Sequence, residues 1–213
     1  MSYFTIKDES TAEFKEKKSI FIGHVKRVES EDEAKEFIKN VKNQHKQARH
    51  NVYSYIIGEN RGIQRYSDDG EPQGTGGIPI MEVFKKSDIT DVAVVVTRYF
   101  GGILLGTGGL ARAYSKGASL AIKEAGVVEK VKGVSVEIVI QYDLLGKLQH
   151  VCAQENFHIE HIDYTEKVKI KILCQFSNLE KLKSQITGVT SGKALFEEDE
   201  TKMYFKLEHR LYE

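Results

Sequence analysis

Hydrophobic positions in the first part of the chain follow two patterns, a helical period and unbroken apolar runs typical of buried strands. Within residues 30–45 they recur three or four positions apart, which predicts an amphipathic helix. Ser30 and Glu33 form the capping box expected at its start. Residues 88–100 contain a continuous β-branched run, typical of a strand buried on both faces. The other elements predicted here are strands at 19–28, 51–57 and 63–67, with a hairpin turn at 58–62, and helices at 78–87 and from the glycine-rich stretch to about residue 125.

From about Gly133 onward glycine becomes rare and apolar residues alternate regularly with polar ones. Strands are predicted at 134–142, 157–164, 167–176 and 202–211, and helices at 143–155 and 177–188. Ser177 and Glu180 form a second predicted capping box. The order β-α-β-β-α-β is the ferredoxin-like pattern. The sequence therefore predicts an α+β protein with two domains, at residues 1–131 and 132–213.

The composition limits which ligands the protein can bind and in which cellular compartment we expect it. Lys plus Arg and Asp plus Glu both number 31, so the formal net charge is zero and any anion site must be local. Cys152 and Cys174 fit neither a disulfide framework nor a zinc motif. We find no signal-peptide pattern and no apolar run of membrane-spanning length, so we expect a cytoplasmic protein without membrane contact.

Glycine is concentrated in one part of the chain, since ten of the 18 glycines lie between Gly70 and Gly117. A strand, a glycine-rich loop and a helix offer free amides and a helix dipole to an anion. Arg112, Lys116, Ser119 and Lys123 would share one face of that helix. The alternative is that the glycines only let the helix pack closely on the sheet. The candidate anion- or RNA-binding residues are Arg98, Tyr99, Gly101, Gly102, Gly106, Gly108, Gly109, Arg112 and Lys116.

Asp68, Asp69 and Glu71 place three carboxylates within four residues. They suit a magnesium site or a general acid–base pair, a turn and helix cap, or the positioning of Arg98 or Arg112. We favour the last two interpretations over metal binding. His50 is a supporting candidate because of the basic residues near it. The sequence shows no nucleophile or metal-ligand signature, so we assign no catalytic residue, metal ligand or cofactor.

Two motifs carry a resemblance to a known family. The stretches "DDGEPQGTGGIPI" at 68–80 and "VVVTRYFGGILLGTGGLARAYSKGA" at 94–118 closely resemble the signature of the IMPACT/YigZ family, and "ARHNVYSY" at 48–55 fits its upstream histidine segment. The second domain also resembles the bacterial members, which carry a small C-terminal ferredoxin-like domain that the eukaryotic members lack. The resemblance implies that the first domain is like a small-subunit ribosomal protein domain and domain IV of elongation factor G. It implies that the second, ferredoxin-like domain is similar to domain V of that factor.

The same resemblance implies a function in translation. It suggests a non-enzymatic regulator that binds RNA or the ribosome through the candidate anion site, with Tyr99 or Phe100 available to stack on bases. Two alternatives stay open. One is an enzyme acting on a small phosphorylated ligand with magnesium held by Asp68, Asp69 and Glu71, with His50 or an acid as the base. The other is a protein-interaction module, as in eukaryotic relatives that compete with the activator of a starvation kinase.

Overall fold

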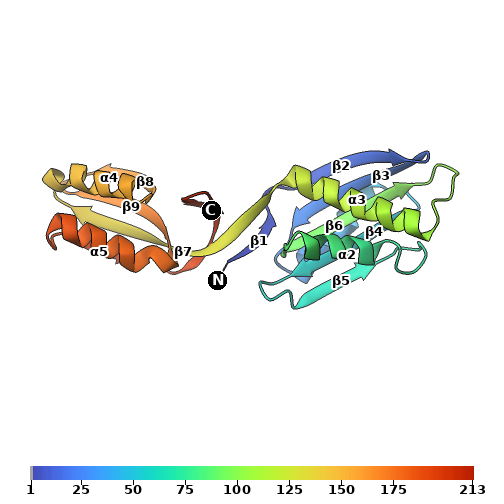
Figure 1. Ribbon diagram of the computed structural model, residues 1–213, viewed down its shortest axis with the longest axis horizontal. Helices are drawn as coiled ribbons and strands as arrows, with labels where there is room; N and C mark the ends of the chain where they lie inside the picture. The colour runs from blue at the N-terminus through green and yellow to red at the C-terminus, as the bar shows by residue number, and fades with distance from the viewer. Residues whose placement is uncertain (1) are drawn as a thin grey trace. The chain divides into compact units, whose positions relative to one another are not determined.

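The computed structural model describes residues 2–213, which form two compact units. One unit comprises Tyr3–Val128, and the other comprises Glu129–Glu213 together with Ser2. Each unit has its own β-sheet and its own hydrophobic cores, and five α-helices lie within residues 2–213 (Figure 1). The mixed α/β architecture agrees with the α+β class predicted from the sequence.

The sheet of the first unit has five antiparallel strands. Their spatial order is β2 (Ser10–Glu16), β3 (Ser19–Arg27), β6 (Val92–Tyr99), β4 (His50–Ile57) and β5 (Ile63–Ser67). A further strand, β1 (Ser2–Ile6), touches the segment before β6 through a parallel bridge between Phe4 and Ile89. The central strand β6 is buried along seven of its eight residues, as its unbroken apolar run predicts.

Both faces of this sheet are covered by helices. Helix α1 (Glu31–Gln44) packs against β4 and β6 on one face. Helices α2 (Gly77–Lys86) and α3 (Thr107–Ala125) cover the other face (Figure 1). One half of the predicted capping box of α1 is present, because the Ser30 hydroxyl accepts from the Glu33 amide at 3.2 Å. The Glu33 side chain accepts at 2.8 Å from the amide of Glu29, the residue before the N-cap, and not from that of Ser30.

Helix α3 lies very close to strand β3. A Cβ atom at Gly23 would lie 2.3 Å from the carbonyl oxygen of Gly117, and a Cβ at Gly117 would lie 2.9 Å from Val96 Cγ1. Two glycines therefore face each other where the helix crosses the sheet. For Gly117 the close-packing interpretation of the glycine-rich region is correct.

The second unit has the predicted order β-α-β-β-α as far as α5, and three strands then follow where one was predicted. Strand β7 (Val127–Ile140) pairs with β9 (Val168–Gln175), and β9 pairs with β8 (Ile159–Tyr164). On its other side β7 pairs with β10 (Leu195–Glu198) and β11 (Lys202–Leu207), and β11 pairs with β12 (Arg210–Tyr212). Helices α4 (Leu145–Gln154) and α5 (Leu179–Thr190) share a core with β7 and β9.

Both cysteines lie in this core. Cys152 is 1% exposed and Cys174 is 2% exposed, and neither forms a disulfide. Burial raises the pKa of each thiol to about 11, because an apolar environment disfavours the thiolate. Both are structural residues of the core, since a reactive cysteine needs access and a low pKa.

Three details of the sequence interpretation are wrong. The capping box of Ser177 and Glu180 does not form, because residues 176–178 make a 3-10 turn and α5 begins only at Leu179 without a side-chain cap. The predicted last strand is two strands, separated where Glu208 adopts a φ of 53°. The sequence interpretation contains no strand between the helix at 177–188 and residue 202, but Leu195–Glu198 form β10, which pairs with β7.

No helix within residues 2–213 combines the length and apolar character that crossing a bilayer requires.

Candidate functional site

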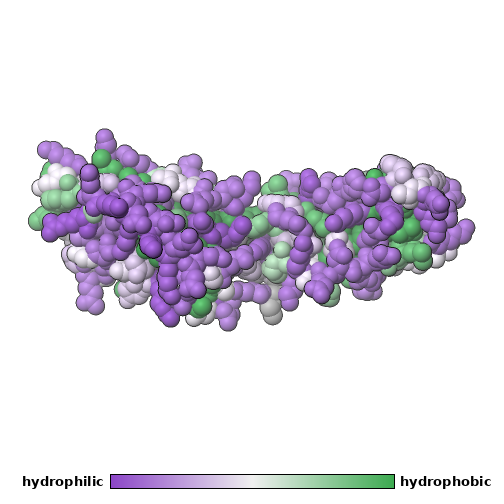
Figure 2. Space-filling view, turned by 180° about the vertical axis from the view of Figure 1, so that it is seen from behind, coloured by the Kyte–Doolittle hydropathy of each residue, from purple (hydrophilic) through white to green (hydrophobic). Residues whose placement is uncertain are grey.

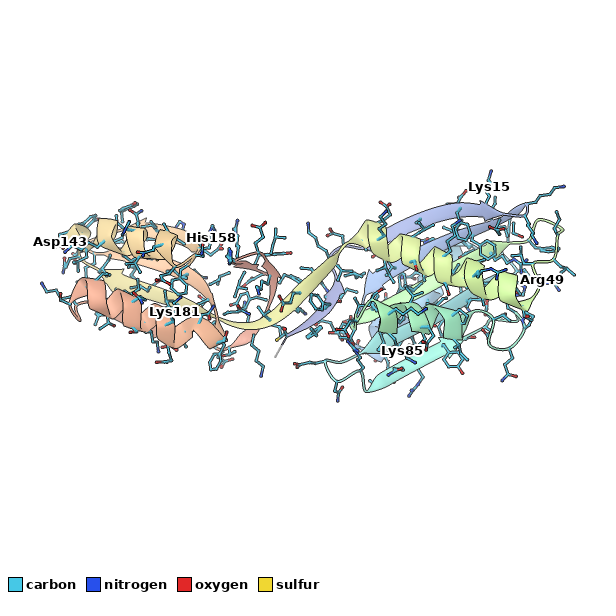
Figure 3. All side chains as sticks on the ribbon, viewed as in Figure 1. Lys15, Arg49, Lys85, Asp143, His158 and Lys181 are labelled. Carbon is cyan, nitrogen blue, oxygen red and sulfur yellow. The ribbon has the colours of Figure 1, made fainter. Side chains whose placement is uncertain are left out.

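Three segments that the sequence analysis singled out meet at one end of the first unit. His50 begins β4 and lies opposite Arg98 near the end of β6. The acidic segment 68–71 follows β5, and the glycine-rich loop 100–106 leads into α3. Figure 3 labels Arg49 at this end, where α3 begins. Together the segments line a cavity of about 350 Å³, whose wall consists of Arg49, His50, Glu71, Pro72, Arg98, Phe100, Leu104, Leu105, Gly106, Thr107 and Leu110.

A buried ion pair forms the polar part of this wall. Arg98 Nη1 donates to Glu71 Oε1 at 2.6 Å, and the two side chains are only 5% and 4% exposed. The Tyr114 hydroxyl donates to the same carboxylate oxygen at 2.7 Å. Burial, and next the negative charge of Glu71, raise the pKa of Tyr114 above its usual value, so this hydroxyl keeps its proton. Glu71 therefore contacts Arg98 directly, as a residue that positions this arginine would.

The other two acids have different partners. Asp68 accepts from the amides of Gly74, Gly76 and Gly77 at 2.8–2.9 Å. The N-cap of α2 is Gly76, which has no side chain to cap the helix, so Asp68 satisfies these amides instead. Asp68 therefore makes the contacts of the turn-and-cap interpretation. Asp69 accepts from Lys42 Nζ and from the Asn51 amide, both at 2.7 Å, and within residues 2–213 neither acid is hydrogen-bonded to Arg98 or Arg112.

The three carboxylates also do not converge in the way a magnesium site needs. Each is directed to a different partner: amides for Asp68, Lys42 for Asp69 and Arg98 for Glu71. Across residues 2–213 there is no cluster of three or more His, Cys, Asp or Glu side chains suited to a metal ion.

A hydrogen bond orients His50 at the cavity wall. Its Nδ1 lies 2.8 Å from the carbonyl oxygen of Asp69. A carbonyl oxygen only accepts, so Nδ1 donates in this contact. His50 thus fixes the acidic segment relative to β4, which agrees with a supporting position at the site.

The glycines of the loop differ in what they do. A Cβ at Gly101 would lie 2.0 Å from the Lys18 carbonyl oxygen, so this glycine permits a close approach between two chain segments. Gly102 and Gly106 have φ values of +84° and +71°, which favour glycine, and open space surrounds them. Gly108 and Gly109 lie in the first turn of α3. Of these glycines, Gly106, Gly108 and Gly109 lie at the start of α3. This helix start has no side-chain cap, so its first amides lack intrahelical acceptors.

Tyr99 does not line the cavity. Successive side chains of a strand point to opposite faces, so Tyr99 and Arg98 diverge. The Tyr99 hydroxyl lies 2.9 Å from His45 Nδ1, just after α1 on the opposite face of the sheet. The strand alternation alone contained this information. Of the two aromatic residues considered for base stacking, Phe100 lines the cavity and is 45% exposed.

A second, basic cavity of about 250 Å³ lies beside the first. Its wall consists of Glu16, Lys17, Leu105, Gly109, Arg112, Ala113 and Lys116, so Leu105 lines both cavities. Arg112 and Lys116 are exposed on α3, as the predicted basic stripe requires. Lys116 Nζ lies 4.5 Å from the centre of the Phe14 ring, a cation–π contact that orients it.

Sequence analysis missed Lys17. It lies in the turn between β2 and β3, where Lys17 and Lys18 adopt φ values of 43° and 66°. Such turns usually contain Asn or Gly, so a pair of lysines gives no hairpin signal. The alternating residues of β2 were the available indication that a strand precedes β3.

Comparison with known proteins finds two family models in the chain. Residues 17–122 match the Impact N-terminal domain, and residues 138–193 match a domain of unknown function (DUF1949). The IMPACT family member YvyE of Bacillus subtilis is 42% identical over 199 residues, which cover 93% of this chain and 92% of that protein. The IMPACT family member YigZ of Escherichia coli is 30% identical over 178 residues, covering 83% and 87%.

Eukaryotic similarity is confined to part of the chain. The protein IMPACT homologue of Dictyostelium discoideum is 36% identical over 94 residues, which cover 43% of this chain and 27% of that protein. Among solved structures, one described as the crystal structure of a hypothetical protein covers 92% of this chain and 96% of its own. It has a TM-score of 0.60 and 27% sequence identity. These similarities support the family resemblance found in the sequence motifs.

Proposed function

The chain belongs to the IMPACT family, and from this premise we propose that its first unit binds single-stranded RNA, free or in the ribosome, as a regulator of translation. The observation that carries the proposal is the pair of adjoining cavities at the start of α3. One is basic and the other is largely apolar with an aromatic side chain at its wall. A nucleotide has the same two parts, a phosphate and a flat base.

The basic cavity is the proposed phosphate site. Lys17, Arg112 and Lys116 supply positive charge, and the uncapped start of α3 at Gly106, Gly108 and Gly109 adds amides and the positive end of the helix dipole. Glu16 in the same wall reduces the net charge, so binding rests on a few contacts. Arg98 is outside this set, because it is buried and paired with Glu71.

The second unit supports the domain assignment implied by the resemblance. The strand order β10-β7-β9-β8, with α4 and α5 on one core, supports the inference that this unit is ferredoxin-like and similar to domain V of elongation factor G. We further infer that residues 1–131 and 132–213 act as separate domains. A function in translation also implies a cytoplasmic protein.

Co-pelleting with purified bacterial ribosomes at increasing salt tests the proposal. The wild-type chain should pellet at low salt and progressively less as salt rises. Arg112→Ala/Lys116→Ala should weaken binding at least about tenfold by removing two phosphate contacts. The matched control is Lys35→Ala/Lys39→Ala, which removes the same charge from exposed positions of α1. Equal loss in both variants, or no pelleting at any salt, would contradict the proposed phosphate site.

A second candidate function is contact with a protein partner, and the loop before α3 favours it. Phe100, Ile103 and Leu104 are 45%, 40% and 82% exposed. Hydrophilic side chains dominate the face drawn in Figure 2, with hydrophobic side chains in smaller areas. Exposed apolar side chains of this kind suit a protein interface. Ribosome binding that resists salt and Arg112→Ala/Lys116→Ala but is lost in Leu104→Asp would favour this alternative.

A further inference from the structure

The side chain of Arg98 has donors that the protein leaves without partners. Its Nη1 donates to Glu71, but within residues 2–213 no acceptor reaches Nε or Nη2, and the residue is 4% exposed. Nearly all buried donors in proteins are satisfied, because an unsatisfied one destabilises the fold. A ligand in the cavity that Arg98 lines would supply the missing acceptors.

The geometry of the guanidinium group restricts that ligand. Arg98 Cζ lies 5.5 Å from the centre of the Phe21 ring and 5.3 Å from that of Phe100, so aromatic rings lie close to the group. The Nε–H and Nη2–H bonds of an arginine point the same way and match two acceptors side by side. Phe100 is half exposed and lines the cavity, so a ligand has access beside it.

Glu71 adds a third requirement. Its Oε1 accepts from both Arg98 and Tyr114, while Oε2 takes part in no hydrogen bond with any of residues 2–213. The polar part of the wall therefore contains two parallel donors, both covered from water, and one acceptor, none with a protein partner within residues 2–213. A carboxylate ligand would satisfy Arg98 but bring a second negative charge close to Glu71. A neutral group that carries two acceptors and a donor on one edge satisfies both residues.

We propose that this cavity is a base-selective pocket that takes a splayed guanine or cytosine from single-stranded RNA. The edge N7, O6 and N1–H of guanine and the edge O2, N3 and N4–H of cytosine each present two acceptors followed by a donor. Adenine and uracil alternate acceptors and donors, so neither matches. Phe100 stacks on the base, and the apolar side chains of Pro72, Leu104 and Leu110 surround it. The pocket adjoins the basic cavity, so this inference rests on the proposed RNA binding.

Fluorescence anisotropy with four labelled heptanucleotides separates the two proposals. Each consists of uridines with guanine, cytosine, adenine or uracil at the centre. The guanine or cytosine oligonucleotide should bind about 5- to 100-fold more tightly than the other two, which is the discrimination that a bidentate arginine contact gives. Equal affinity for all four would overturn the base pocket and leave RNA binding intact. Binding of none of them would overturn RNA binding itself.

A pair of matched variants locates the selectivity. Phe100→Ala removes the proposed stacking ring, which also contacts Arg98, but it keeps the Arg98–Glu71 ion pair. A base that no longer stacks is not held against Arg98, so the preference for guanine or cytosine should fall to less than about threefold. Phe176→Ala removes an aromatic ring that is 53% exposed in the second unit, and it should leave the preference unchanged. A preference that survives Phe100→Ala would place the selection outside this cavity and overturn the proposal.

Discussion

Arg98 and Glu71 hold the site together at the scale of single residues, and the cost of separating them is measurable. Glu71→Ala leaves a buried guanidinium without its countercharge, so the free energy of unfolding should fall by about 3–5 kcal/mol. Glu82→Ala is the control, because Glu82 forms an ion pair with Lys85 on the exposed side of α2, where solvent screens the pair, and its loss should change stability far less. Urea unfolding of the two variants gives the comparison, and equal losses would contradict the importance of burial.

A pair of histidines on the other face of the first unit makes stability depend on pH. Burial, and next the charge of His45, lower the pKa of His24 from 6.5 to about 4. The His24 and His45 rings lie 4.9 Å apart, and burial also lowers the pKa of His45. The unfolded chain then binds protons that the folded chain does not. The contribution of His24 is complete above pH 6.5 and is lost as the pH falls towards 4.

Urea unfolding between pH 7 and pH 4.5 checks this expectation. The free energy of unfolding should fall less over this range in His24→Gln than in the wild-type chain, because the glutamine cannot take up a proton. His161→Gln is the control, since this histidine side chain is 65% exposed. The same pH dependence in wild type and His24→Gln would refute the assignment.

At the scale of elements, the contact between α3 and β3 gives a prediction with a built-in comparison. Gly117→Ala places a methyl group 2.9 Å from Val96 Cγ1 and should lower the free energy of unfolding by about 1–3 kcal/mol. Gly188→Ala makes the same change in α5, where nothing lies within 4 Å of the new atom, and should raise stability by about 0.5–1 kcal/mol. Thermal unfolding measures both, and changes of the same sign would disprove the close packing.

Much of the element pattern was available from the sequence because it depends on local signals. Periodicity and the capping box located α1, and an unbroken β-branched run located β6. The elements that were missed lack such signals. Strand β2 is followed by a turn of two lysines, which are not typical hairpin residues, and β10 has only four residues. At α5 the Ser177–Glu180 spacing suggested a cap, but the 3-10 turn moved the helix start.

The site was predictable to a similar extent. The motifs placed Glu71, Arg98, Arg112 and Lys116 in one region, because glycine clustering and helical spacing are visible in the chain. Which acid binds which partner was not visible, since Asp68, Asp69 and Glu71 are neighbours in sequence but have different contacts. Such pairing depends on where distant segments meet. Lys17 joins the site only through the packing of β2 and β3.

At the scale of the whole molecule, zero net charge limits how strongly RNA binding can depend on salt. Three cationic side chains line the basic cavity: Lys17, Arg112 and Lys116. If each neutralises one phosphate of a single strand, a plot of log affinity against log salt concentration should have a slope of about −2. Anisotropy with an oligouridylate between about 50 and 200 mM salt measures it. A slope of about −5 or steeper would require cations beyond this cavity.

The burial of Cys152 and Cys174 has a practical consequence for labelling. With a pKa of about 11, each thiol is a thiolate in only about one molecule in ten thousand at pH 7, and neither is accessible to a reagent. A maleimide dye should therefore react almost solely with a cysteine introduced at an exposed position such as Leu104, with both native cysteines left in place. The loop beside both cavities then carries a fluorophore that reports directly on what enters them.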